Sequence, residues 1–201
     1  MEYILLGGIF IWPIVLESIL ALLVIIERIL FFVFVLPRKH RALSKLLNLS
    51  WEGESNWDVP HELGELVEAM KRAHEQRSLH LSLLAVHAEK LINEVERYLT
   101  ILNVVAQTAP LFGLLGTVTG MIKLFMSIES QSLAGLPITP SSLAGGIWEA
   151  LITTAAGLIV GIPALIAFVL FNRLVDRFAG EVDAFLSEIA HRASLLGWEV
   201  V

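Results

Sequence analysis

The chain has 201 residues, of which 56% are hydrophobic and 17% are charged. Its mean hydropathy of +0.73 is high for a water-soluble domain and indicates a membrane protein. The formal net charge of −6, without a basic run that carries interleaved aromatic residues, argues against binding to nucleic acid. The sequence contains no cysteine, which excludes disulfides and thiolate metal sites.

Three apolar runs follow one another along the chain, at about residues 3–36, 101–128 and 143–171. Each exceeds the roughly 20 residues that a helix needs to cross the bilayer core, so we expect tilt or continuation beyond the lipid. The sequence predicts an all-α integral membrane protein with three transmembrane helices. We assign transmembrane helices to 1–36, 100–128 and 143–171, a cytoplasmic helical segment to 37–99, a short periplasmic loop to 129–142 and a cytoplasmic C-terminal helix to 172–201.

The distribution of Lys and Arg predicts the orientation of these spans. Arg28 lies near the end of the first span, and "PRKHR" (37–41) follows it. Six more basic residues lie before span two, three lie after span three, and the 129–142 loop has none. Because cytoplasmic loops carry the excess of Lys and Arg, we expect the N-terminus outside and the C-terminus in the cytoplasm.

The predicted cytoplasmic parts have helical periodicity. Asp58-Val59-Pro60 resembles a helix start, and apolar residues then recur at helical spacing within 63–70 and 81–99. The second of these stripes is predicted to run straight into span two. A third stripe, from Val175 to Ile189, continues span three. We expect the stripes to pack as a helical bundle below the membrane, into which spans two and three extend.

No enzyme motif accompanies this layout. All six histidines lie in the predicted cytoplasmic parts, and none forms the i, i+4 pair of a helical metal site. The sequence also lacks a nucleophile elbow, a P-loop and a zincin motif. We therefore predict no enzymatic activity, no metal site and no cofactor.

Spans two and three each carry a stripe of small and hydroxylated residues. At about 100° per residue, one face of each helix gathers the positions Ala106, Pro110, Gly113, Thr117 and Gly120 in span two, and Ala150, Thr154, Gly157 and Gly161 in span three. Small residues let helices approach closely in lipid, so helix packing is one interpretation of Gly113, Gly120, Gly157 and Gly161.

A pore lining is the other interpretation of these stripes. Thr117 and Thr154 lie at nearly the same predicted depth, about 15 and 17 residues from the inner ends of their spans. In a ring of subunits, such hydroxyls could hydrogen-bond water or a partner's carboxyl group. Thr153 lies next to Thr154 but about 100° away around the helix.

Few charged residues fall within the spans, and such residues are candidates for function. Glu149 and Lys123 have similar predicted depth and opposite charge, so they form either a salt bridge or two side chains that reach separately for the outer interface. Glu149 shares a face with Thr153, about 140° from Thr154, and the spacing leaves open which face looks into a pore. Glu17 lies near the middle of span one, where we expect it to be protonated or partnered, but the sequence names no partner.

The segments "TAPLFGLLGTVTGMIKLF" (108–125) and "GGIWEALITTAAGLIVGIPA" (145–164) resemble the two signature segments of the MotA/TolQ/ExbB proton-channel family, and most closely its ExbB/TolQ branch. The motifs cover most of residues 100–175, and the remainder resembles the family only in layout. The resemblance implies a proton-pathway role for Thr117, Thr154 and Glu149. Thr153 stands where some relatives have Ala, and any role of Lys123 lies outside the resemblance.

The resemblance also implies partners and a location. Family members form homopentamers in the bacterial inner membrane around single-span partners of the ExbD/TolR type. A transmembrane Asp of the partner carries the proton, and the work passes to TonB-type or TolA-type proteins for outer-membrane transport or envelope maintenance. This fits a sequence in which neither threonine stripe carries a mid-membrane carboxylate.

Two alternatives stay open at this point. A MotA-type flagellar stator is weakened by three predicted spans rather than four. A structural membrane scaffold would use the small stripes for packing alone. The sequence does not distinguish TonB-type from Tol-type or other motors, and it gives neither the transported substrate nor the partner stoichiometry.

Overall fold

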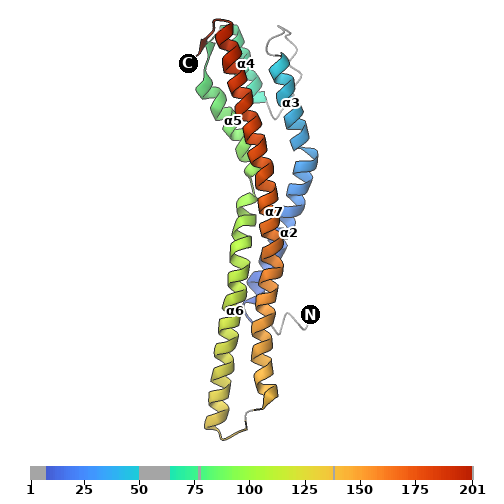
Figure 1. Ribbon diagram of the computed structural model, residues 1–201, viewed down its shortest axis with the longest axis vertical. Helices are drawn as coiled ribbons and strands as arrows, with labels where there is room; N and C mark the ends of the chain where they lie inside the picture. Colours follow the sequence, from blue (N-terminus) through green and yellow to red (C-terminus); the bar gives the residue numbers. More distant parts are fainter. Residues whose placement is uncertain (1–7, 50–63, 77, 138, 201) are drawn as a thin grey trace. The chain divides into compact units, whose positions relative to one another are not determined.

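The computed structural model describes residues 8–49, 64–76, 78–137 and 139–200 (Figure 1). These residues are almost entirely helical, which confirms the predicted fold class. The helices are α2 (Ile11–Phe34), α3 (Leu36–Leu49), α4 (Gly64–Gln76), α5 (Leu81–Glu96), α6 (Leu99–Leu133) and α7 (Pro140–Leu195). The sequence did not predict two short parallel strands, β1 (Ser78–Leu79) and β2 (Glu199–Val200), which pair with each other.

Three stretches of helix are long and apolar enough to cross a membrane, namely Ile11–Leu46, Leu99–Leu133 and Leu143–Leu195. Many of their large apolar side chains are exposed, as contact with lipid requires. Leu111 on α6 is 60% exposed and Ile159 on α7 is 71% exposed. Charged side chains in such positions would be costly in a bilayer, so the apolar surface is consistent with a multi-pass membrane protein.

Glycines mark the ends of the two longest helices. The left-handed Gly135 (φ 67°) follows α6, where its N–H donates to Ser132 O at 3.1 Å and the next N–H, of Leu136, donates to Gln131 O at 3.0 Å. This pair of bonds satisfies carbonyls that the helix leaves without partners. Gly197 (φ 72°) follows α7 in the same way. α6 continues to Leu133 and α7 begins at Pro140, so both helices extend into the stretch 129–142 that the sequence assigned to a periplasmic loop.

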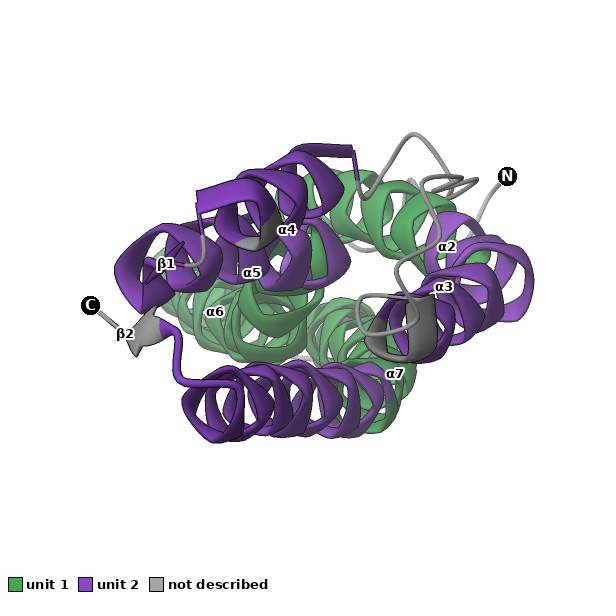
Figure 2. Ribbon diagram, turned by 90° about the horizontal axis from the view of Figure 1, so that it is seen from above, with its two compact units in different colours: residues 1–26, 98–170 green, residues 27–97, 171–201 purple. Residues whose placement is uncertain are grey.

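The described residues belong to two compact units (Figure 2). Unit 1 comprises residues 1–26 and 98–170, and unit 2 comprises residues 27–97 and 171–201. Unit 1 therefore contains α6, the first part of α7 and the first part of α2. Unit 2 contains the remainder of α2, α3, α4, α5, the strand pair and the remainder of α7.

Unit 2 has a core built from the apolar stripes that the sequence predicted. The buried side chains include Leu66, Val67 and Met70 of α4, Leu84, Ala88, Leu91 and Val95 of α5, and Val175, Phe178, Val182, Phe185 and Ile189 of α7. Their spacing of three and four residues places each set on one face of its helix. The predicted helix start at 58–60 lies outside the described residues.

The chain between α5 and α6 differs from the prediction, because the stripe within 81–99 does not run straight into span two. The helix α5 ends at Glu96, and Tyr98 adopts a left-handed conformation (φ 72°) before α6 begins. Within unit 2, Arg28 Nη1 donates to Val95 O at 2.9 Å, which satisfies a carbonyl in the last turn of α5. By contrast, α7 continues as a single helix of 56 residues.

Candidate functional site

The helices α6 and α7 of one chain pack closely against each other, and glycines line the contact. A Cβ on Gly116 would lie 2.5 Å from Thr153 Oγ1, and one on Gly161 would lie 2.7 Å from Pro110 Cγ. A Cβ on Gly157 would overlap the carbonyl oxygen of Ala109. Any larger side chain at these positions would push the two helices apart, so the glycines serve helix packing.

Gly113 and Gly120 belong to the same contact. A Cβ on Gly113 would lie 2.9 Å from Thr153 O, and one on Gly120 would lie 3.2 Å from Ala150 Cβ. The four glycines of the predicted stripes therefore face the other helix of the same subunit.

Thr117 of α6 and Thr154 of α7 meet beside these glycines, and their hydroxyls hydrogen-bond each other. Thr117 Oγ1 also lies 3.1 Å from Ala150 O, and Thr154 Oγ1 lies 3.2 Å from Gly113 O. Each hydroxyl thus reaches a backbone carbonyl of the opposite helix. Either hydroxyl can act as the donor in the pair, so the hydrogen bond between them can run in both directions. Both side chains are half-buried.

Thr153 has a different environment from its neighbour in the sequence. Its side chain is fully buried, and its hydroxyl donates to the carbonyls of its own helix, with Ala150 O at 2.9 Å. The side chain covers Gly116 of α6. Thr153 therefore packs between the helices, while Thr154 takes part in the hydroxyl pair.

Lys123 and Glu149 join α6 and α7 nearer the loop that connects these helices. Lys123 Nζ lies 2.6 Å from Glu149 Oε1, and the two side chains are 58% and 24% exposed. Gly8, in a left-handed conformation (φ 64°), lies directly over the pair, since a Cβ there would overlap Glu149 Oε1. The sequence reasoning missed Gly8, for which it had no signal beyond the residue type.

Glu17 of α2 lies against α6. Its Oε1 is 2.5 Å from Thr108 Oγ1, while its Oε2 is buried without a hydrogen-bond partner among the residues that the structure describes. Thr108 is the partner that sequence reasoning could not name. It lies in the first signature segment, but its spacing to Glu17 in the sequence carries no information about contact.

These contacts distinguish two edges of the α6–α7 pair. The N-terminal part of the chain covers one edge, where Glu17 meets Thr108 and Gly8 meets Glu149. On α6, Thr117 lies nine residues after Thr108, which is about 180° around the helix. The hydroxyl pair of Thr117 and Thr154 therefore lies on the edge opposite to α2.

Unit 2 holds several ion pairs outside this site. Lys90 Nζ lies 2.7 Å from Glu65 Oε2, and this hydrogen bond is the main cause that lowers the pKa of the Glu65 carboxyl. His87 Nδ1 is 3.2 Å from Glu65 Oε2, an ion-pair distance without hydrogen-bond geometry. His40 Nδ1 is 2.5 Å from Glu181 Oε2. Within the described ranges, no three His, Cys, Asp or Glu side chains gather as they would around a metal ion.

Comparison with known proteins connects this geometry to a family. The model of the MotA/TolQ/ExbB proton channel family matches residues 59–184, more than half of the chain. The chain belongs to this family. The match includes both threonines of the hydroxyl pair, the glycines of the α6–α7 contact and Glu149.

Individual relatives place the chain on the ExbB branch of the family. It is 28% identical over 197 residues to biopolymer transport protein exbB1 of Vibrio cholerae, covering 90% of this chain and 83% of the relative. It is 32% identical over 189 residues to putative biopolymer transport protein ExbB-like 1 of Synechocystis, covering 89% and 72%. Biopolymer transport protein ExbB of Xanthomonas campestris is 37% identical over 91 residues, which cover 45% of this chain and 34% of the relative.

Family membership supplies the general function. The chain is a multi-pass membrane protein of a proton-channel family whose ExbB members are named for biopolymer transport. This is a family of channels that energise transport and not a known class of enzymes.

Proposed function

We propose that this ExbB-family protein is the ring-forming subunit of a proton-driven motor in the bacterial inner membrane. Five copies surround a single-span partner of the ExbD/TolR type, whose transmembrane Asp takes up and releases the proton. The N-terminus is periplasmic and the C-terminus is cytoplasmic. The motor passes work to a TonB-like or TolA-like protein for outer-membrane transport or envelope maintenance.

The observation that carries this proposal is the hydroxyl pair of Thr117 and Thr154 on the edge opposite to α2. A ring of subunits needs one surface toward lipid and another toward its axis. Because α2 lies on one edge of the α6–α7 pair, the opposite edge is the one that can face the axis. A hydroxyl donates to a carboxylate and accepts from a carboxylic acid, so this edge suits a partner Asp in both protonation states.

Glu149, Lys123 and Thr153 have supporting roles in the proposal. Glu149 lies at the outer end of the pathway, where the 2.6 Å ion pair with Lys123 holds its carboxylate in place. Thr153 packs on Gly116 and sets the spacing of α6 and α7, and therefore the position of the adjacent Thr154.

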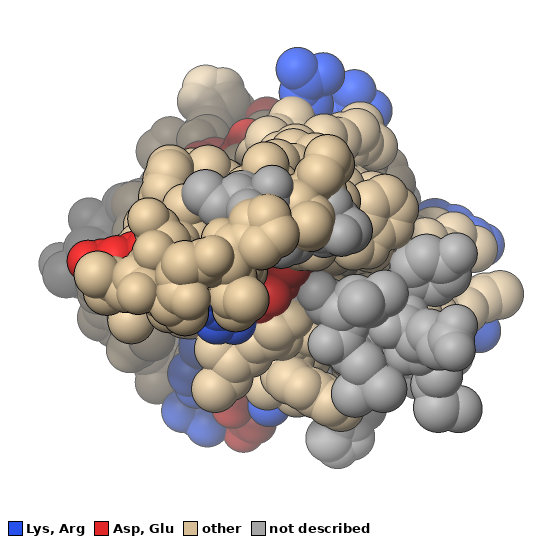
Figure 3. Space-filling view, turned by 90° about the horizontal axis from the view of Figure 1, so that it is seen from below, with Lys and Arg blue, Asp and Glu red and all other residues tan. Residues whose placement is uncertain are grey.

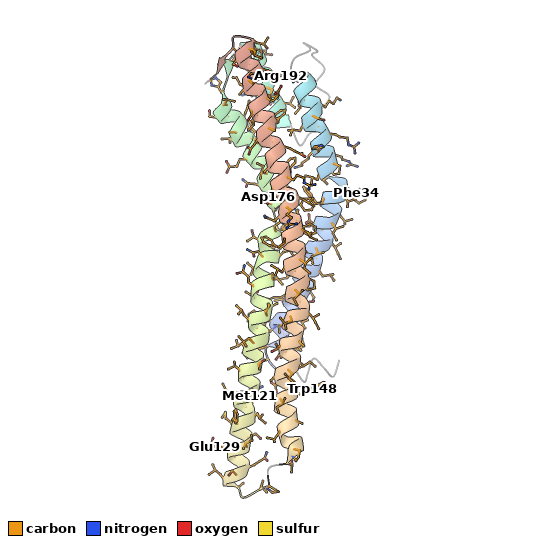
Figure 4. All side chains as sticks on the ribbon, in the orientation of Figure 1. Phe34, Met121, Glu129, Trp148, Asp176 and Arg192 are labelled. Atoms are coloured by element: carbon orange, nitrogen blue, oxygen red, sulfur yellow. The ribbon has the colours of Figure 1, made fainter. Side chains whose placement is uncertain are left out.

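The proposed orientation rests on the charge of the hairpin that joins α6 and α7. Residues 129–142 contain no Lys or Arg, whereas the segments assigned to the cytoplasm contain most of the basic residues. Figure 3 views the molecule from the hairpin end, and the surface nearest the viewer consists mostly of uncharged side chains. Glu129, labelled in Figure 4, lies near this end of α6.

The experiment compares Thr154→Val with Thr119→Val in liposomes that contain the protein and its single-span partner. Val keeps the shape of Thr but removes the hydroxyl. Thr119 is the matched control, because among the described residues its hydroxyl binds carbonyls of its own helix alone, Leu115 O at 2.9 Å and Gly116 O at 3.1 Å. Proton flux and assembly are measured on the same preparations, the latter by native mass spectrometry.

We expect Thr154→Val to assemble as pentamers and to lose flux. One hydrogen bond worth about 0.5–1.5 kcal/mol corresponds to about a 2- to 13-fold change in rate, and the loss recurs in every subunit. Thr117→Val should lose flux in the same way as Thr154→Val, and Thr154→Ser should lose less. Thr119→Val should keep normal flux. Full flux through normally assembled Thr154→Val would refute the pathway.

A structural scaffold is the second candidate, because the glycines of both stripes are used in helix packing within the chain. A scaffold would show no partner-dependent proton flux in the wild-type protein. The same liposome experiment therefore distinguishes the two candidates.

A further inference from the structure

We propose that Glu17 and Thr108 form a second proton-binding site within the membrane, on the edge that α2 covers. Glu17 lies on the buried face of α2, between Ile14 and Ala21, which are 2% and 5% exposed. Glu17 Oε1 lies 2.5 Å from Thr108 Oγ1. The ligand of this site is a single proton on each chain.

Two oxygen atoms lie within hydrogen-bonding distance of the Thr108 hydroxyl. Thr108 Oγ1 lies 2.8 Å from Val104 O as well as 2.5 Å from Glu17 Oε1. A hydroxyl has one proton to donate, and a backbone carbonyl can only accept. If Thr108 donates to Val104 O, the second contact is a hydrogen bond only when Glu17 carries a proton and donates it to Thr108. One proton on Glu17 thus turns both contacts into hydrogen bonds.

The second carboxyl oxygen of Glu17 also favours the protonated state. Oε2 is buried and has no hydrogen-bond partner within the described part of the chain. An ionised carboxylate would leave charge on this buried, unpaired oxygen, whereas a neutral carboxylic acid leaves only a carbonyl. The proton therefore removes the charge and completes the bond to α6.

No other charged side chain in the described part of unit 1 stabilises an ionised Glu17. Its other titratable residues are Tyr98, Lys123, Glu129 and Glu149. Lys123, the single basic residue among them, is bound to Glu149 at 2.6 Å. A site at Thr108 is also about 180° around α6 from Thr117. The Glu17 proton is therefore separate from the pathway proposed for the hydroxyl pair.

Infrared spectroscopy of the full-length protein in lipid, without any partner, tests the site at neutral pH. Omitting the partner makes the outcome independent of the proposed function. The variants are Glu17→Gln, Thr108→Val and, as the control, Glu129→Gln on the exposed outer part of α6. We expect the wild-type spectrum to contain a protonated carboxyl C=O band that disappears in Glu17→Gln, shifts in Thr108→Val and is unchanged in Glu129→Gln.

Two results would overturn the proposal. The first is that the Glu17-dependent signal lies in the carboxylate region, or appears there only with added Na⁺, which would make the site ionised or a cation site. The second is an unshifted band in Thr108→Val, which would exclude the hydroxyl as partner. If Glu17→Gln does not fold, selective ¹³C labelling of glutamate side chains in wild-type and Thr108→Val protein still reports both the band and its shift.

Discussion

Gly157 of α7 offers a direct measure of how tightly α6 and α7 pack within one chain. In Gly157→Ala the new Cβ would overlap Ala109 O and lie 3.1 Å from Gly113 Cα. These are backbone atoms, so no side-chain rotation can make room and the helices must separate. Gly145→Ala on the same helix is the control, since a Cβ at Gly145 has no atom of another described element within 4 Å.

The magnitude follows from two opposing effects. Replacing Gly by Ala inside a helix stabilises it by about 0.5–1 kcal/mol, and this gain applies to both variants. Overpacking a closely packed contact costs about 1–3 kcal/mol and applies only to Gly157→Ala. The gain cancels in the comparison, so Gly157→Ala should have a free energy of unfolding about 1–3 kcal/mol below that of Gly145→Ala.

The assay is equilibrium unfolding of the purified variants in mixed micelles, followed by helix content. Gly145→Ala should be at least as stable as the wild-type protein. Equal stability of Gly157→Ala and Gly145→Ala would refute the reasoning, because it would mean that the stripe of α7 does not contact α6 within the chain. The glycines could then no longer be assigned to helix packing, and a pore lining would again be an open interpretation of the stripe.

Two further predictions concern the ion pair and the orientation. A double-mutant cycle of Lys123→Met and Glu149→Gln on stability should give a coupling energy of about 0.2–1 kcal/mol, as for other partly exposed pairs, and strict additivity would show that the 2.6 Å contact contributes nothing. Ser132→Cys should react with an impermeant thiol reagent in intact cells while Ser44→Cys and Ser187→Cys should not, and the chain has no native cysteine to interfere; labelling of Ser44→Cys from outside would overturn the proposed orientation.

Much of the fold was predictable because it depends on patterns within single helices. The lengths of the apolar runs gave three spans, and the spacing from Val175 to Ile189 gave the buried face of α7 in unit 2. Helical spacing alone put Gly113 and Gly120 on one stripe, as the α6–α7 contact has them. These properties follow from the period of the helix and from the length needed to cross a bilayer.

The sequence predicted which candidate residues share a helix face, but not which partners these residues meet. Spacing along a helix fixes which residues share a face, but it does not fix which neighbour that face meets. The sequence therefore could not choose between the Thr153 and Thr154 faces. In the structure Thr153 is buried on Gly116 while Thr154 meets Thr117 on the edge opposite to α2.

The sequence by itself determined the three spans, the helical stripes and the family. Only the tertiary structure decided the partner of Glu17, the backbone of Gly8 over the Lys123–Glu149 pair and the break at Tyr98. No Gly or Pro between residues 81 and 99 marks that break. It coincides with a hydrogen bond from Arg28, 67 residues before Val95, and such a contact between distant segments leaves no local pattern in the chain.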